Sequence, residues 1–213
     1  MTVIDCIGKY VDQAKARVPI FTNEIYNYVE QKLPNVKKNL FNEYIIRYAK
    51  ANPTFVRHKR GIYYKTVVTP FGKAGISYPD LIKKVYLTNG DNVIGYESGP
   101  SYMNKIGLTT QIPSHTYIVT ERTKYAVLDE SDKILLLKPV VKVNNENYRY
   151  LQFLDILDNK MKIKIEAENS NLILRRYIDR YGLNFERLLG YARQYKNNKI
   201  YPQLAELAKG VDA

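Results

Sequence analysis

The sequence has few of the residues that covalent cross-links and metal centres require. Its 213 residues include one cysteine, Cys6, and no tryptophan. A single cysteine excludes an intramolecular disulfide and any metal site built from several cysteines. The two histidines, His58 and His115, lie far apart and lack the His-x-x-x-His spacing of a zinc enzyme. We therefore expect neither a metal nor a cofactor.

Long hydrophobic runs and the common catalytic motifs are also missing. No window approaches the roughly 18 consecutive apolar residues of a membrane span. The N-terminus lacks the basic segment and apolar core of a signal peptide. There is no phosphate-binding Gly-Lys-Ser/Thr loop, no Gly-x-Ser-x-Gly elbow and no Asp-x-Asp pair for magnesium. We expect a cytoplasmic protein that has no membrane contact and no enzymatic activity.

Positive charge is abundant and unevenly distributed. The net charge of the chain is +12, which favours an anionic partner. Residues 1–65 hold 12 Lys/Arg against 5 Asp/Glu, whereas the remaining 148 residues hold 21 against 16. The first third is therefore the more basic part per residue, as expected of a surface that binds nucleic acid.

Apolar residues recur at helical spacing in three segments before residue 52. The first helix is expected to run from Val3 to about Ala16. The second begins at Thr22, which we predict to be a side-chain N-cap, and ends before Pro34. Asn35 is expected to cap a third helix that continues to about Ala51. The predicted buried stripe of this third helix is Val36, Leu40, Tyr44, Ile45 and Tyr48.

A basic hairpin is predicted after these helices. Phe55–His58 and Ile62–Lys65 have strand composition and flank Lys59-Arg60-Gly61, where the glycine supplies the positive φ of a tight turn. Residues 18–20 are extended and are expected to pair with the hairpin as a third strand. Two helices joined by a short turn and followed by a basic hairpin are typical of a winged helix-turn-helix domain, predicted here for residues 1–65.

The candidate DNA-binding residues lie at the start of the third helix and along the hairpin. Four of them are expected to read base edges in the major groove: Lys37, Lys38, Asn39 and Asn42. Five more are expected to contact phosphates or the neighbouring minor groove: Arg47, His58, Lys59, Arg60 and Lys65. The alternative interpretation is that these charges only form a solvated helix face.

The rest of the chain predicts a linker and a second domain. Residues 66–78 contain prolines and glycines without periodicity and are interpreted as the linker. Residues 79–213 then form an α+β domain with a small sheet and a helical C-terminal tail. Its predicted strands are Thr116–Thr120, Tyr125–Leu128 and Ile134–Val143. Its predicted helices are Asp80–Leu87, a short one ending near Ile106, Tyr150–Leu157, Asn171–Tyr181, Phe185–Tyr195 and Tyr201–Lys209.

Several motifs in the middle of the chain carry a family resemblance. They are Gly61-Ile62-Tyr63-Tyr64-Lys65, Thr69-Pro70-Phe71-Gly72, Gly107-Leu108-Thr109-Thr110-Gln111-Ile112-Pro113 and Ile118-Val119-Thr120-Glu121-Arg122. Residues 20–140, which hold these motifs, resemble the AbiEi family of antitoxins from type IV toxin–antitoxin (abortive infection) systems. The resemblance implies that an N-terminal winged helix represses the operon. It also implies that a C-terminal domain counters a nucleotidyltransferase toxin encoded beside it, with or without direct contact.

Other interpretations remain open at this point. The Ser98–Pro113 block is also explained by turns around one short helix, with Thr109, Thr110 and Gln111 bonding local backbone. The chain as a whole is also consistent with a winged-helix regulator whose second domain senses a small ligand. A more remote alternative is a degenerate nuclease. Asp158-Asn159-Lys160 matches the acid-x-Lys part of a nuclease motif. It lies far from Pro79-Asp80, which matches the Pro-Asp part.

Overall fold

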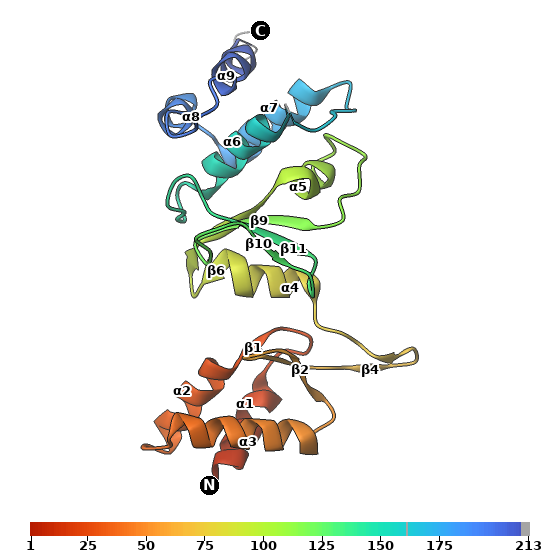
Figure 1. Ribbon diagram of the computed structural model, residues 1–213, viewed down its shortest axis with the longest axis vertical. Helices are drawn as coiled ribbons and strands as arrows, with labels where there is room; N and C mark the ends of the chain where they lie inside the picture. The colour runs from red at the N-terminus through yellow and green to blue at the C-terminus, as the bar shows by residue number, and fades with distance from the viewer. Residues whose placement is uncertain (161, 210–213) are drawn as a thin grey trace. The chain divides into compact units, whose positions relative to one another are not determined.

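The structure, a computed structural model, describes residues 1–160 and 162–209 (Figure 1). The chain is a mixed α+β protein, as expected, and divides into two compact units, Met1–Val85 and Tyr86–Ala213. The boundary between the units lies beyond the predicted linker, residues 66–78. Across the described ranges, every helix is too short or too polar to cross a membrane.

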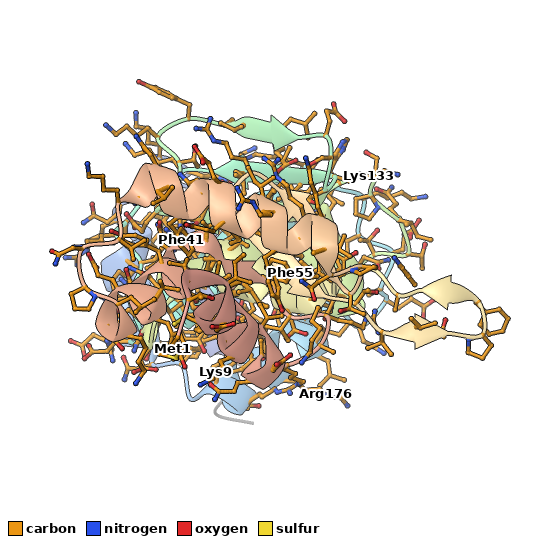
Figure 2. The ribbon with its side chains drawn as sticks, turned by 90° about the horizontal axis from the view of Figure 1, so that it is seen from below. Met1, Lys9, Phe41, Phe55, Lys133 and Arg176 are labelled. Carbon is orange, nitrogen blue, oxygen red and sulfur yellow. The ribbon has the colours of Figure 1, made fainter. Side chains whose placement is uncertain are left out.

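Three helices and a three-stranded antiparallel sheet form most of the N-terminal unit. In chain order these elements are α1 (Val3–Gln13), β1 (Ile20–Phe21), α2 (Thr22–Lys32), α3 (Lys38–Ala51), β2 (Phe55–Lys59) and β3 (Ile62–Lys65). The strand order is β1-β3-β2, with Ile20 opposite Tyr63. The predicted pairing of a third strand with the hairpin is confirmed, although this strand is Ile20–Phe21 rather than residues 18–20. The helices and the sheet enclose one core, to which Phe41 and Phe55 contribute (Figure 2).

The caps predicted for α2 and α3 are wrong. Thr22 is the first residue of α2 and makes no side-chain cap. The start of this helix is instead stabilised by Glu24, whose carboxylate accepts the Phe21 N–H at 3.0 Å. Asn35 has a φ of 75° and lies in the turn, and α3 begins only at Lys38. Asparagine tolerates this left-handed conformation better than most residues, which explains its place there.

The predicted buried stripe of α3 is confirmed only in part: Ile45 is buried, Tyr44 and Tyr48 are half-buried, and Val36 lies before the helix. Leu40 is 46% exposed, whereas Phe41 and Ile45 are buried. The Phe41 ring packs edge-on against Tyr26, with the ring centroids 5.2 Å apart. Because successive helical residues are about 100° apart, burying Phe41 in place of Leu40 turns a different set of side chains toward solvent.

The segment interpreted as a linker is structured. It contains a small antiparallel ribbon, β4 (Val68–Thr69) and β5 (Gly72–Lys73). The following helix, predicted as one piece, is α4 (Tyr78–Ile82) continued by a π-helical turn, η1 (Lys83–Leu87). Lys84 donates to the Pro19 carbonyl at 2.8 Å and pairs with Glu24 at 2.9 Å. These bonds attach the segment to the N-terminal unit.

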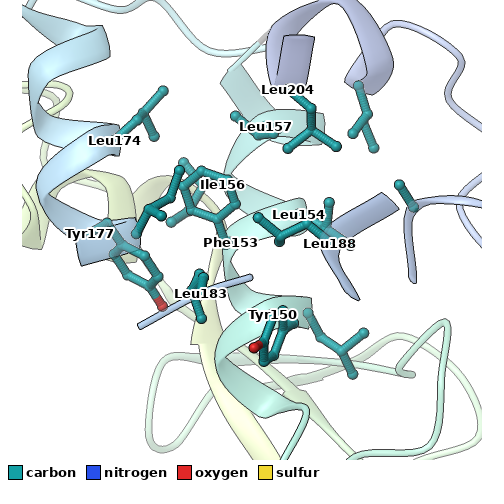
Figure 3. Close-up of a cluster of buried hydrophobic side chains, with 14 of the residues drawn as sticks. Tyr150, Phe153, Leu154, Ile156, Leu157, Leu174, Tyr177, Leu183, Leu188 and Leu204 are labelled. Atoms are coloured by element: carbon teal, nitrogen blue, oxygen red, sulfur yellow. The ribbon is translucent and has the colours of Figure 1, made fainter. Parts of the chain in front are cut away.

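The C-terminal unit combines a four-stranded sheet with helices. Its elements are β6 (Thr88–Asn89), β7 (Asn92–Val93), β8 (Gly95–Ser98), α5 (Gly99–Lys105), β9 (Thr116–Thr120), β10 (Val127–Asp129), β11 (Ile134–Leu137), α6 (Tyr148–Lys160), α7 (Ser170–Tyr181), α8 (Phe185–Ala192) and α9 (Ile200–Ala208). The strand order is β10-β11-β9-β8, and only the pairing of β11 with β9 is parallel. α6 forms the centre of the core, where Phe153 and Leu154 are fully buried against α7, α8 and α9 (Figure 3).

Three strands of this sheet depart from the prediction. β10 is Val127–Asp129 rather than Tyr125–Leu128. β11 ends at Leu137 rather than Val143, and Pro139 follows closely, which cannot donate to a ladder. β8 was not predicted from the sequence, because the glycines at both of its ends resemble turn residues. Gly95 is required by space: a Cβ atom there would lie 2.6 Å from the Val119 carbonyl oxygen and 2.7 Å from that of Tyr86. Glycine in a strand marks such a close backbone approach.

Candidate functional site

The candidate base-reading residues all lie on the exposed side of α3 or just before it. Lys37, Lys38, Asn39 and Asn42 are exposed, as is Arg47. Helical spacing places Lys38 and Asn42 along one edge of this side and Arg47 along the other. The Lys38 ammonium lies 5.7 Å from the centre of the Tyr26 ring, and the Arg47 guanidinium lies 5.6 Å from that of Tyr44. Such cation–π contacts hold both groups near the helix surface.

The centre of the exposed side of α3 is less basic than its edges. Asn39, Glu43, Ile46 and Lys50 follow one another there at helical spacing. Glu43 is exposed and repels phosphate, and Ile46 is 46% exposed. Glu43 lies at the centre because Phe41, and not the predicted Leu40, faces the core.

The turn between β2 and β3 presents one fully available cation. Arg60 is exposed at its tip, and Gly61 has the predicted positive φ, 77°. His58 and Lys59 are half-buried, and each takes part in an interaction of the folded chain. The Lys65 ammonium donates to the Asp12 carbonyl at 3.0 Å, so this side chain ties β3 to the end of α1. Among the hairpin candidates, Arg60 is the most accessible to a phosphate.

The cations at the start of α3 and those at the turn between β2 and β3 do not form one cluster. The Gly61 carbonyl accepts the Thr22 N–H at 2.9 Å, which places the turn beside the first residue of α2. Lys37 and Lys38 follow the other end of that helix. The two sets of cations are therefore separated by about the length of α2, roughly 16 Å at 1.5 Å per residue. This spacing suits two separate contacts along an extended anion.

Charge is concentrated in the N-terminal unit. Residues 1–85 hold 15 Lys/Arg against 6 Asp/Glu, whereas residues 86–213 hold 18 against 15. The net charges are therefore +9 and +3, although the second unit is the longer one. A polyanion is attracted mainly to the first unit.

A cavity of about 500 Å³ lies between α5 and α7 in the C-terminal unit, and we call it the α5–α7 cavity. Lys105, Arg176 and Arg180 line it together with three tyrosines, Tyr102, Tyr177 and Tyr181. Burial raises the pKa of Tyr102 to about 12 and also raises that of Tyr177, so both hydroxyls stay protonated at neutral pH. The cavity thus combines cations with neutral aromatic hydroxyl groups.

A buried amide, that of Gln152, holds one of the tyrosines that line this cavity, Tyr177. Gln152 is buried, and its carbonyl accepts the Tyr177 hydroxyl at 2.7 Å and the Arg149 guanidinium at 2.8 Å. Its amide donates to the Glu97 carbonyl at 2.7 Å. The Arg149 guanidinium also lies 4.0 Å from the centre of the Tyr181 ring. These bonds hold the tyrosines in one arrangement, and sequence reasoning had no signal for them.

A second cavity in this unit, of about 610 Å³, borders Asp155. The carboxylate of Asp155 accepts hydroxyls from Tyr96 at 3.2 Å, Ser98 at 3.0 Å and Tyr195 at 2.7 Å. Burial nevertheless raises the pKa of Asp155 to about 6, and the neighbouring Asp158 carboxylate adds to the rise. Hydroxyl donors are weaker than a cation at stabilising a buried carboxylate, which explains the direction of the shift.

The acidic residues that the nuclease alternative requires do not form a metal site. Asp158 pairs with Lys162 at 2.6 Å and accepts the Asn197 amide at 2.6 Å. Within residues 1–160 and 162–209, His, Cys, Asp and Glu form no group of three that could hold a metal ion.

The block that carries the family resemblance has a structural explanation in part. It contains α5, which is followed by Gly107 with a φ of 82°, a conformation common just after a helix C-terminus. Thr109 accepts the Gln111 N–H at 3.2 Å, which is the expected local bond. Thr110 does not bond locally: its N–H donates to the Glu166 carboxylate at 2.9 Å, and its hydroxyl bonds the same carboxylate. This block therefore connects the end of α5 to the segment before α7.

Neither the protein-family models nor the curated proteins to which the sequence was compared give a match. The resemblance to the AbiEi antitoxins therefore rests on the motifs of the sequence alone.

Proposed function

We propose that the N-terminal unit is a winged helix-turn-helix domain that binds duplex DNA, with α3 as the recognition helix. The observation that carries this proposal is the order of elements, α1-β1-α2-α3-β2-β3, with strand order β1-β3-β2. That order puts a helix pair before a hairpin whose third strand comes from between the first two helices. The charge of +9 in this unit supplies the attraction to phosphates.

We further propose that the protein is a repressor and antitoxin of the type IV class. In this proposal it autoregulates its operon and counters a nucleotidyltransferase toxin. The support is the motif resemblance, of which Gly107–Pro113 and Ile118–Arg122 lie in the C-terminal unit. Co-expression with a nucleotidyltransferase encoded by the neighbouring gene tests this part. Growth that stops with the enzyme alone and resumes with this chain supports the proposal, and growth that does not resume contradicts it.

DNA binding is expected to weaken when Lys37 and Arg60 are both replaced by alanine. Lys37 is exposed beyond the end of α2, and Arg60 is exposed in the turn beside its start, so each can contact a different phosphate. Losing two phosphate contacts should lower the affinity for operator and random DNA alike. It should also flatten the slope of log K against log salt by about 1–2, since each contact contributes about 0.9. Fluorescence anisotropy at several salt concentrations measures both quantities.

The matched control removes two exposed cations from the C-terminal unit, Lys124 and Arg193. It lowers the net charge by the same amount and should leave the salt slope unchanged. Equal effects of the two double variants would show that binding depends on net charge only and would remove α3 and the turn from the interface.

Ligand sensing by the C-terminal unit is the second candidate function, and the α5–α7 cavity is the observation that favours it. Arg176 and Arg180 are four residues apart on α7, so both face the same side of the helix. Lys105 also lines the cavity but is paired with Glu97 at 2.9 Å. The two arginines and the tyrosine rings therefore suit an anionic ligand that has an aromatic ring, such as a nucleotide.

We expect Arg176→Gln/Arg180→Gln to weaken ATP binding by about tenfold or more, the scale of one lost charged hydrogen bond. Calorimetry with ATP and with tripolyphosphate separates the contribution of the ring from that of the phosphates. The control is Arg193→Gln. Arg193 is the exposed residue that follows α8, and its substitution should leave binding unchanged. If the wild-type chain binds neither probe, this cavity is not a nucleotide site.

A further inference from the structure

The ribbon formed by β4 and β5 carries apolar side chains that no other part of the N-terminal unit covers. Phe71 is fully exposed, Val68 is 69% exposed and Val67 is 42% exposed. The ribbon extends away from the three helices of its unit in two views at right angles (Figures 1 and 2). Single exposed apolar residues are common, but neighbouring ones at the end of a projecting ribbon indicate a contact site.

The tip of the ribbon is held in one conformation. The Thr69 hydroxyl donates to the Gly72 carbonyl at 2.8 Å and accepts the Phe71 N–H at 3.3 Å. Pro70 restricts its own φ, and Gly72 adopts a φ of 105° that other residues rarely reach. The backbone under Phe71 is therefore ordered in advance, which reduces the entropy lost when the ring enters a binding partner.

The base of the ribbon is attached firmly to the N-terminal unit. The Thr66 hydroxyl donates to the Ala74 carbonyl at 2.6 Å, and the Ala74 N–H donates to the Val67 carbonyl at 2.8 Å. Lys73 donates to the Pro53 carbonyl at 3.1 Å, just beyond the end of α3. Arg17 donates to the Gly75 carbonyl at 2.9 Å. The position of the tip is thus fixed relative to the rest of the N-terminal unit.

The charge of the surrounding sequence identifies the class of partner. Residues 44–79 contain seven Lys/Arg and not one Asp or Glu, and the ribbon lies inside this stretch. Such a segment attracts a polyanion and repels basic protein surfaces, including that of a second copy of this basic unit. Across residues 72–75, which follow the tip, Lys73 is the one large side chain, so the tip itself, Pro70 and Phe71, is the part that can enter a minor groove about 6 Å wide.

We propose that Phe71 acts as an apolar wedge that enters the DNA minor groove, unstacks one base step and bends the duplex. This inference rests on the proposed DNA binding by α3 and names a second contact for the same unit. Minor-groove proteins unstack DNA with phenylalanine or proline side chains supported by nearby cations. Here Pro70 and Phe71 form the tip, and the acid-free stretch supplies the cations. A bent duplex then reaches both α3 and the ribbon.

The test uses the full chain with Phe71→Ala. Because Phe71 is exposed, its truncation should leave the fold and the melting temperature unchanged. Affinity is measured by anisotropy, and bending is measured by energy transfer between dyes at the two ends of the duplex. The variant should bind about tenfold more weakly, the scale of one lost aromatic–base contact, and should leave the duplex straight. Ile112, an apolar residue in the other unit, is 90% exposed, and Ile112→Ala should change neither quantity.

The Lys37→Ala/Arg60→Ala variant provides the second comparison. It should bind weakly but still bend the DNA once bound, because it keeps the wedge. If the wild-type chain binds DNA without bending it, and Phe71→Ala binds in the same way, the wedge proposal is wrong and the proposed DNA binding stands. A wild-type chain that binds no DNA overturns both. If Phe71→Ala abolishes self-association in the ultracentrifuge and leaves bending unchanged, the ribbon is a contact between copies and the wedge is wrong.

Discussion

Phe153→Ala is expected to destabilise the C-terminal unit by about 3–5 kcal/mol, the usual cost of removing a fully buried phenylalanine from a core. Phe153 has no exposed surface and lies at the centre of α6, among side chains from α7 (Figure 3). None of the buried residues of its core belongs to residues 1–85. The DNA binding proposed for the N-terminal unit should therefore survive the substitution, while the proposed toxin neutralisation should be lost.

Phe41→Ala is the matched variant for the other unit. Phe41 is equally buried in the core of the N-terminal unit, so the expected loss of stability is similar. In this case DNA binding should disappear and toxin neutralisation should persist. Thermal unfolding followed by calorimetry should show one transition shifted in each variant. If both variants shift a single shared transition, the two units unfold together and the division of functions between them is contradicted.

The stability of the C-terminal unit is expected to fall by about 3 kcal/mol as the pH rises from about 4 to about 6. The pKa of Asp155 is raised from 3.8 to about 6 in the folded chain. The folded state therefore binds the proton more tightly than the unfolded state, and the free energy of unfolding decreases with pH between these two values. Each unit of pKa corresponds to about 1.4 kcal/mol. Above about pH 6 this contribution no longer changes.

Asp155→Asn should remove this pH dependence, since the amide does not titrate and can still bond the three hydroxyls. Denaturant unfolding at a series of pH values measures the slope in both proteins. Asp179→Asn, at an exposed position of α7, is the control and should retain the wild-type slope. An unchanged slope in Asp155→Asn would show that another group titrates in this range.

Much of the secondary structure follows from sequence periodicity. α1, α2 and the helices after residue 148 contain apolar residues at helical spacing, so their positions are predictable to within a few residues. β9, with the sequence Thr-Tyr-Ile-Val-Thr, is confirmed residue for residue. The Lys59-Arg60-Gly61 turn was also predictable, because its glycine adopts the positive φ that a hairpin requires.

Other features depend on contacts that a single sequence does not reveal. Leu40 and Phe41 are adjacent and both apolar, so packing against the rest of the core, including the Tyr26 ring, decides which one is buried. The two-residue strands of the ribbon are too short to show any alternation. Lys65 was a candidate phosphate ligand from its charge, but its partner, the Asp12 carbonyl, is distant in sequence. The same is true of Gln152 and of the bond between Thr110 and Glu166.

Hydrogen bonds at the base of the ribbon allow the length of the ribbon to change independently of the rest of the N-terminal unit. The bonds between Thr66 and Ala74 complete the hydrogen bonding at the point where the ribbon leaves the unit. Residues between these two positions can therefore be inserted or deleted in pairs without altering the register below them or the packing of α3. The reach of the tip is thus free to vary in evolution while the helical core stays constant. In a related chain, the ribbon is where we expect the length to differ first.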